Sequence, residues 1–139
     1  MRVLTVPNEF LRRVAAPLAR LDGESSAKIR EMLSTLARLK GAGLAAPQVG
    51  WDARVFVTPG RAYLNPRILA AAGTSIGEEG CLSIPGVVGR VDRASFVRLE
   101  YWDLSGRQHT DTLHGLAARV AQHEIDHLDG ILFTDRMGA

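Results

Sequence analysis

The pentapeptide His123-Glu124-Ile125-Asp126-His127 constrains this chain more than any other segment. Histidines four positions apart lie one above the other on a single face of an α-helix, so both imidazoles can reach one metal ion. Glu124 lies between them and is placed to move protons for a water molecule at that ion. The pattern therefore predicts a helix that carries a catalytic metal centre.

The neighbouring residues predict that this helix is buried on the side of its histidines. Apolar residues and the two histidines recur at spacings of three and four, which is the period of one helix face. The members of this stripe are Leu113, Leu116, Val120, His123 and His127. We expect the helix to begin at about His114 or Gly115 and to extend to Leu128, before Asp129-Gly130.

The rest of the chain predicts one α+β domain over residues 1–139, because this length leaves no room for a second core. An amphipathic helix is expected over residues 25–40, with Gly41 as its C-terminal cap. Strand-like runs follow at residues 54–57, 62–64, 87–88, 96–102 and 107–113. We therefore expect short antiparallel or mixed strands packed around the central C-terminal H-E-x-x-H helix, with one N-terminal amphipathic helix.

Composition excludes several classes of protein. An apolar fraction of 46% rules out disorder, and no run approaches the roughly 18 apolar residues of a membrane span. The N-terminus has no apolar signal segment. A single cysteine rules out an internal disulfide and favours a reducing compartment. We therefore expect a cytoplasmic protein that does not contact a membrane.

The basic residues argue against a specific nucleic-acid partner. Arginine and lysine together number 17, but they are scattered along the chain and aromatic residues make up only 6%. A nucleic-acid surface normally gathers basic residues into a stripe interleaved with aromatics. We interpret the arginines as solvated surface residues.

Two histidines need a third protein ligand. In the extended protease pattern H-E-x-x-H-x-x-G-x-x-H, Gly130 matches but Phe133 occupies the final ligand position. The downstream carboxylates Asp129 and Asp135 are typical of turns, so the missing ligand is expected upstream. Cys81, the only thiol, is the best candidate, since a Cys/His/His set can leave an open position for water. A packing role for this thiol and a metal-free Cys/His nucleophile pair remain alternatives.

A third segment, Gly41-Ala42-Gly43-Leu44-Ala45-Ala46-Pro47-Gln48, combines small residues with an amide. Small residues allow another backbone to approach closely, and Gln48 offers a hydrogen-bond donor. No strand is expected before it and G-x-G-x-x-G is absent, so a nucleotide loop is disfavoured. Alone, the segment is equally typical of a helix cap followed by a tight strand.

Taken together, three segments strongly resemble the three motifs of the peptide deformylase family, in the family's order. They are the segment ending at Gln48, Glu79-Gly80-Cys81-Leu82-Ser83, and Gln122-His123-Glu124-Ile125-Asp126-His127. The similarity extends to Pro7-Asn8-Glu9-Phe10-Leu11-Arg12-Arg13-Val14-Ala15, to Leu64-Asn65-Pro66 and to Leu128-Asp129-Gly130-Ile131-Leu132-Phe133. It covers nearly the whole chain.

The resemblance implies metal-dependent removal of the formyl group from N-formylmethionine on nascent polypeptides, with release of formate. It assigns Cys81, His123 and His127 as ligands of one divalent ion, which in this family is usually Fe²⁺, with Zn²⁺, Ni²⁺ or Co²⁺ as substitutes. Glu124 would be the catalytic acid and base, and the Gln48 side chain and the Leu82 backbone N–H would stabilise the oxyanion. The substrate-binding residues implied are Ala42, Gly43, Gly80, Leu116 and Val120.

The chain departs from the family pattern in two places. The segment between Val57 and Tyr63 is shorter than usual, and the sequence ends at Ala139 without the further helix of many bacterial members. In lacking that helix it resembles phage-encoded members, which would act in the host cytoplasm. Because the C-terminal tail of bacterial members is associated with ribosome docking, its absence puts that partner in doubt. The active-site motifs remain complete.

Two other functions are carried as alternatives. A metallopeptidase of the H-E-x-x-H type would cut internal peptide bonds and ignore the formyl group. A non-catalytic metal-binding or arginine-mediated binding protein would have lost activity, but the intact Glu124 and Gln48 argue against it. Formate release from a formyl-Met tripeptide, beside an acetyl-Met control, separates these possibilities.

Overall fold

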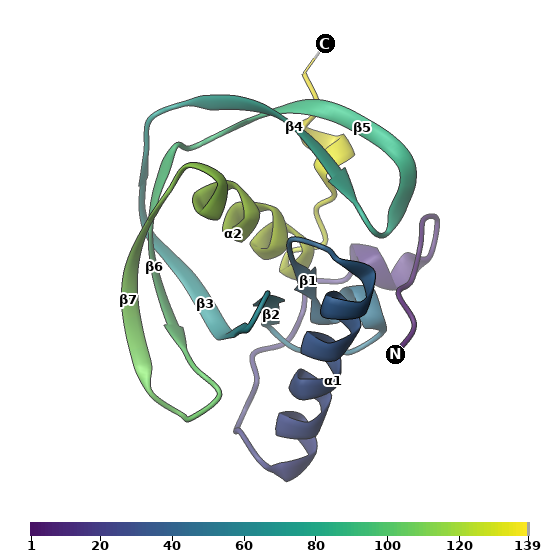
Figure 1. Ribbon diagram of the computed structural model, residues 1–139, viewed down its shortest axis with the longest axis vertical. Coiled ribbons are helices and arrows are strands. Elements are labelled where there is room, and N and C mark those ends of the chain that lie inside the picture. Colours follow the sequence, from purple (N-terminus) through teal and green to yellow (C-terminus); the bar gives the residue numbers. More distant parts are fainter. Residues whose placement is uncertain (139) are drawn as a thin grey trace.

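The computed structural model describes residues 1–138, in which helix α2 (Gly115–Leu128) lies at the centre (Figure 1). An antiparallel sheet with strand order β1-β2-β3-β6-β7 curves around one side of α2. Its strands are β1 (Leu44–Ala45), β2 (Val55–Thr58), β3 (Arg61–Ala72), β6 (Phe96–Trp102) and β7 (Gln108–His114). No helix in this part of the chain is long and apolar enough to cross a membrane. The α+β class predicted from the sequence is confirmed.

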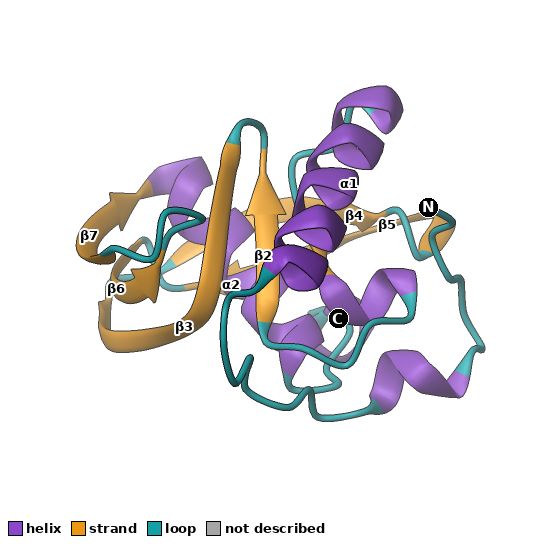
Figure 2. Cartoon of the chain, turned by 90° about the horizontal axis from the view of Figure 1, so that it is seen from below, coloured by secondary structure: helices purple, strands orange, loops and turns teal. Residues whose placement is uncertain are grey.

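Strand β2 shows how the two helices are held on opposite faces of the sheet. Val55 and Val57 belong to an apolar cluster with Ile29 and Met32 of helix α1 (Gly23–Leu39). Phe56, between the two valines, points to the other face, since side chains alternate along a strand. There it belongs to a second cluster with Tyr63, Leu99, Ile125 and Leu128, the last two from α2. Burial on both faces fixes α2 against the sheet, and Figure 2 shows α1 beside β2.

Helix α1 begins two residues before the predicted start at Ser25 and ends one residue before the predicted end at Lys40. Asp22 and Ser25 form a reciprocal capping box at its start, which satisfies backbone N–H groups that lack helical partners. Lys40, with φ 54°, is the left-handed residue at its end, so the predicted cap at Gly41 was wrong. Gly41 is small for another reason: a Cβ there would lie 2.8 Å from Leu36 Cδ1.

Strand β3 is longer than predicted. The sequence Asn65-Pro66 suggested that the strand ends at Leu64, yet β3 continues to Ala72. The register shifts between Leu64 and Arg67, so Asn65 and Pro66, which lie between them, form a bulge and do not end the strand. Asn65, with φ 48°, accepts a hydrogen bond from the Leu18 N–H (2.8 Å) and donates one to the Leu18 carbonyl (3.0 Å). Tertiary contacts thus stabilise the irregular position.

Strands β4 (Ser75–Cys81) and β5 (Ile84–Arg93) form a separate two-stranded sheet that arches over α2 (Figure 1). The sequence predicted only residues 87–88 of this hairpin. Glycine and glutamate are disfavoured in strands, and they supply four of the seven β4 residues. Pairing with β5 from Ser75↔Arg93 to Cys81↔Ile84 outweighs that preference. This hairpin brings Cys81 over the histidine helix.

Candidate active site

Helix α2 directs both histidines inward, as their spacing predicts. His123 is 8% exposed and His127 only 1%. Leu116 was expected on the same buried stripe but is 72% exposed. It lies in the first turn of α2, where it lines the mouth of a cavity instead of the core. The inward face of α2 is therefore buried only in its later turns.

Cys81 lies at the end of β4, opposite the two histidines. Its Sγ is 3.2 Å from His127 Nε2, and the candidate ligand atoms of Cys81, His123 and His127 all lie within 4.8 Å of one another. Burial lowers the pKa of His127 to about 3, so its imidazole is neutral. Two imidazole nitrogens and a thiol sulfur suit Fe²⁺, Zn²⁺, Ni²⁺ or Co²⁺. The three residues fit one such ion.

Glu124 is buried beside these ligands. Its side-chain Oε1 has no hydrogen-bond partner within residues 1–138. Burial raises the pKa of the Glu124 carboxyl to about 7, although the charges of His123 and Arg93 oppose the shift. The Gly43 backbone packs against the carboxylate, since a Cβ on Gly43 would lie 2.6 Å from Glu124 Oε2. A carboxyl with a pKa near neutrality can both accept and donate a proton.

Gln48 is held in one orientation by its neighbours. It lies in the 3₁₀ helix Ala46–Val49, and its Oε1 accepts a hydrogen bond from the Ala45 N–H at 2.8 Å. Its Nε2 donates to Ser83 Oγ at 3.1 Å and faces Cys81 Sγ at 3.6 Å. The amide nitrogen therefore points toward the candidate ligands, as an oxyanion donor would require.

A cavity of about 630 Å³ lies above these residues. Its lining includes every substrate-binding residue that the resemblance implies, together with Leu82. These are Ala42, Gly43, Gly80, Leu82, Leu116 and Val120. A cavity of this size, mostly apolar with a few polar groups at its base, is typical of a small-ligand or peptide site.

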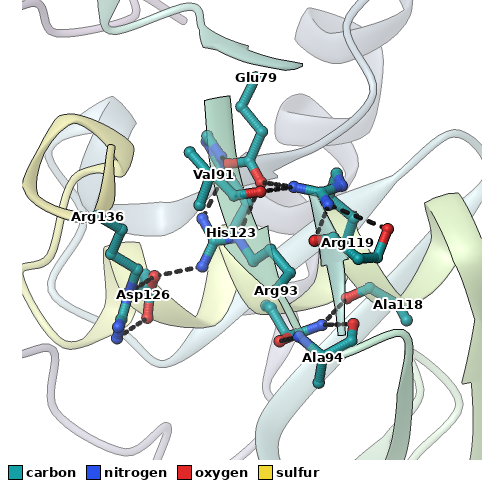
Figure 3. Close-up of polar contacts among 11 residues, drawn as sticks. Glu79, Val91, Arg93, Ala94, Ala118, Arg119, His123, Asp126 and Arg136 are labelled. Carbon is teal, nitrogen blue, oxygen red and sulfur yellow. Dashed lines mark hydrogen bonds and ion pairs between the residues drawn. The ribbon is translucent and has the colours of Figure 1, made fainter. Parts of the chain in front are cut away.

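Sequence reasoning missed the group of residues that orients His123. Glu79 Oε1 accepts a hydrogen bond from His123 Nδ1 at 2.8 Å, which leaves Nε2 available as a metal ligand (Figure 3). Arg93 and Arg119 both donate to Glu79 Oε2, at 2.8 and 2.7 Å. Burial raises the pKa of Glu79, but the hydrogen bonds from Arg93, His123 and Arg119 outweigh it and hold the pKa well below its usual range. The Glu79 side chain is therefore ionised at neutral pH.

The interpretation of the arginines as surface residues was wrong for two of them. Arg93 is 6% exposed and Arg119 is 8% exposed, because both pair with Glu79 and Arg93 also pairs with Asp126. Spacing gives a weak signal for this group. Glu79 lies two residues before Cys81, on the same face of a strand, and Arg119 lies four before His123, on the same face of a helix.

The position that a peptidase of the extended H-E-x-x-H type would use for its third ligand carries a phenyl ring. Phe133 is 1% exposed, and its ring stacks on His123 with 6.0 Å between centroids. A third ligand from this position is therefore excluded, and the thiol that lies within ligand distance of both histidines is Cys81. Together, the fold and the site define a class: a metal-dependent hydrolase with a Cys/His/His group that could hold the metal ion.

Comparisons with known proteins identify the family within that class. The family profile "Polypeptide deformylase" matches residues 1–139. The peptide deformylase of Chlorobium luteolum is 43% identical over 144 residues, covering 96% of this chain and 76% of the relative. That of Rhodopirellula baltica is 41% identical over 147 residues, covering 99% and 73%. The chain belongs to the peptide deformylase family.

Solved structures of peptide deformylases have the same fold as this chain. The peptide deformylase from Thermotoga maritima has a TM-score of 0.96 and 38% identity, with coverage of 99% of this chain and 97% of that one. The enzyme from Synechococcus elongatus, solved in complex with actinonin, has a TM-score of 0.97 and 40% identity, covering 100% and 79%. The protein is thus an enzyme that removes the formyl group of N-formylmethionine from nascent polypeptides, as predicted. The likeness to phage members stays an expectation.

Proposed function

We propose that Cys81, His123 and His127 hold one divalent ion, Fe²⁺ in the native enzyme, and that Glu124, Gln48 and Leu82 carry out the deformylation beside it. The observation that carries this assignment is the buried Glu124 Oε1, which has no partner within residues 1–138 and lies next to the ligand group. When bound, the ion would act as a Lewis acid and lower the pKa of a bound water. The choice of Fe²⁺ rests on the family, and the donor set is compatible with it.

Glu124 has the proton-transfer role in this proposal. Its carboxylate would take a proton from the attacking water and deliver it to the departing amine. Both transfers use the same carboxyl, so a pKa of about 7, raised by burial, suits the two directions equally. The Gly43 backbone, packed against Oε2, would keep the carboxylate in place between the two steps.

Gln48 and Leu82 would stabilise the negative charge that develops on the formyl oxygen. The Gln48 amide already has its oxygen engaged with Ala45, so its nitrogen is oriented before substrate arrives. Leu82 follows Cys81 in the turn between β4 and β5 and lines the same cavity. Loss of one such donor typically lowers turnover by about 10²–10³.

The substrate would bind as an extended chain between β4 and the segment 41–43. Within residues 1–138 β4 pairs only with β5, so its other edge is available for a peptide strand. Backbone groups of Ala42, Gly43 and Gly80 would pair with the peptide. Leu116 and Val120 would receive the methionine side chain, since both line the cavity, about two turns and one turn before His123.

We also place the reaction in the cytoplasm, with N-formylmethionyl peptides as the partners of the site. A thiol that serves as a metal ligand must remain reduced, and the cytoplasm keeps thiols reduced. The substrate class, nascent polypeptides, points to the same compartment.

The test replaces Glu124 by Ala and by its isostere Gln. We expect each variant to keep its metal and its fold, to bind a formyl-Met tripeptide nearly normally, and to lose about 10²–10⁴ in turnover. Metal analysis, thermal melting, peptide binding and anaerobic formate release would be measured on one preparation, with acetyl-Met peptide as the control substrate. Loss of metal in parallel with activity would make Glu124 a ligand instead. Wild-type turnover in Glu124→Gln would disprove proton transfer by this residue.

A further inference from the structure

The proposed ligands come from two parts of the fold that belong to different sheets or pack on different sheets. His123 and His127 are on α2, which packs on the five-stranded sheet, whereas Cys81 is on the separate β4–β5 hairpin. The buried apolar residues of the hairpin, Ile84 and Val91, form a cluster with Leu11, Leu132 and Phe133, and none of these belongs to α2. Apart from the Phe133 ring that stacks on His123, polar contacts between the hairpin and α2 therefore set the distance from the thiol to the histidines.

Arg119 makes the most extensive of these contacts. From α2, its Nη1 donates to Glu79 Oε2 at 2.7 Å and to the Val91 carbonyl at 2.9 Å. Its Nη2 donates to the Ser75 carbonyl at 2.7 Å and to Ser75 Oγ at 3.3 Å. One side chain thus joins the helix to both strands of the hairpin, at the start of β4, near its end and in β5 (Figure 3). Unlike the Glu79–His123 pair, it does this without touching a proposed metal ligand.

The hairpin is shaped to receive this guanidinium. A Cβ on Gly77 would lie 3.0 Å from Arg119 Cζ and 3.1 Å from its Nε and Nη2. The flat face of the guanidinium therefore lies directly on the Gly77 backbone, and a larger residue would push it away. Gly77 lies between the two β4 residues that Arg119 contacts, Ser75 and Glu79, so the strand is held on both sides of this point.

Burial makes the ion pair between Arg119 and Glu79 costly to break. The Arg119 side chain is 10% exposed and that of Glu79 is 5% exposed. Breaking a buried ion pair by removing one partner leaves the other charge uncompensated, which is costly. Arg119 also fixes the carboxylate that orients His123, so its position bears on both halves of the ligand set.

We propose that Arg119 is a positioning residue of the metal site: it sets where β4 lies on α2 and thereby the spacing of Cys81 from His123 and His127. This inference rests on the proposed ligand set. It predicts that Arg119 determines metal affinity and the geometry of the bound ion. Residues that orient ligands in this way typically change metal affinity by about 10–100-fold when replaced.

The experiment titrates metal-free protein with Co²⁺ under anaerobic conditions and records both affinity and the visible spectrum. Arg119→Gln should bind Co²⁺ about 10–100-fold more weakly and show a weaker sulfur-to-cobalt band, and Arg119→Lys should recover part of both. Arg136→Gln is the matched control, since Arg136 donates to Asp126 of the same ion cluster but, within residues 1–138, makes no side-chain hydrogen bond to the hairpin. It removes the same charge and should leave affinity and spectrum close to wild type.

A second perturbation keeps every charge. Gly77→Ala should displace the guanidinium and weaken Co²⁺ binding in the same direction but by less, and it should have no further effect in the Arg119→Gln background. Gly23→Ala, where no atom lies within 4 Å of the new Cβ, is its control. This variant decides the question if Arg119→Gln does not fold.

The outcomes separate this inference from the ligand assignment. If Cys81→Ser binds Co²⁺ as tightly as wild type, the ligand set itself is wrong. If Cys81→Ser is weak while Arg119→Lys and Gly77→Ala both keep wild-type affinity and spectrum, the ligands stand and the role of Arg119 is refuted. If Arg136→Gln loses as much Co²⁺ affinity as Arg119→Gln, the loss is a general effect of charge, and the proposed role of Arg119 is also refuted.

Discussion

Replacement of Gly43 by Ala tests how closely the backbone holds the catalytic carboxylate. The new Cβ would lie 2.6 Å from Glu124 Oε2, 2.9 Å from its Cγ and 3.0 Å from its Cδ. Because an ordinary contact begins near 3.4 Å, the carboxylate must shift by roughly 0.8 Å. Gly43 does not have a positive φ, so Ala is compatible with the backbone and the effect is purely steric.

The shift gives an estimate of the loss in rate. A misplacement of about 1 Å at a reacting group costs on the order of 10²-fold, and proton transfer by a positioned side chain contributes about 10²–10⁴. We therefore expect Gly43→Ala to lower kcat for formyl-Met tripeptide about 10²-fold and to retain metal. Formate release, metal analysis and thermal melting would be measured beside Gly23→Ala, the same substitution in open space.

A double-mutant cycle decides whether Glu124 transmits the effect. In a Glu124→Ala background the overlap no longer exists, so Gly43→Ala should cost almost nothing further. If Gly43→Ala is equally costly in that background, the methyl group acts on the substrate or on the chain and not on Glu124. Wild-type kcat in the single variant would refute the reasoning outright, since it would mean that a displaced carboxylate works equally well.

Three further predictions address the metal and the sheet. Cys81→Ser should exchange a thiolate for a weaker ligand and reduce metal occupancy and activity together, as metal analysis of the purified variant would show; full occupancy and turnover would leave Cys81 a packing residue. If the native ion is Fe²⁺, activity should decay in air and be protected by Ni²⁺ or Co²⁺ substitution, and air-stable activity with iron alone would contradict this. Burial and the hydrogen bond to Asp111 (2.6 Å) raise the pKa of Tyr101 above 10, so its stabilising contribution is complete below pH 10 and is lost as the pH rises further. Tyrosinate absorbance should show one of the two tyrosines titrating late, and Tyr101→Phe should remove that phase.

The parts of the site that the sequence predicts are those determined within a few residues. Helical spacing alone brings His123 and His127 to one face, and helix α2 lies where this pattern indicates. The orientation of Gln48 is also local, because its Oε1 is fixed by the N–H of Ala45, three residues earlier. In both cases the relevant residues lie within four positions of one another in the sequence.

The β4–β5 hairpin required information that lies outside any local window. The residues of β4 have low strand propensity, and the strand forms because β5 pairs with it along its length. Propensity is measured for a residue in isolation, whereas this pairing depends on a partner strand and on α2 below it. The place of Cys81 over the histidines therefore follows from the resemblance and the structure, and not from the spacing of its own segment.

The burial of Arg93 and Arg119 is even harder to predict from the local sequence. An arginine alone is a surface residue, because removal of its charge from water is too costly without a partner. Arg93 and Arg119 are buried because Glu79 accepts hydrogen bonds from both, and these partners lie 14 and 40 positions away in the sequence. His123, 44 positions from Glu79, completes the group. None of these side chains reveals by its own neighbours that it will be buried; the group forms only once the hairpin lies on α2. The residues that orient His123 are thus the least predictable part of the site, because each is stable in its place only when the others are present.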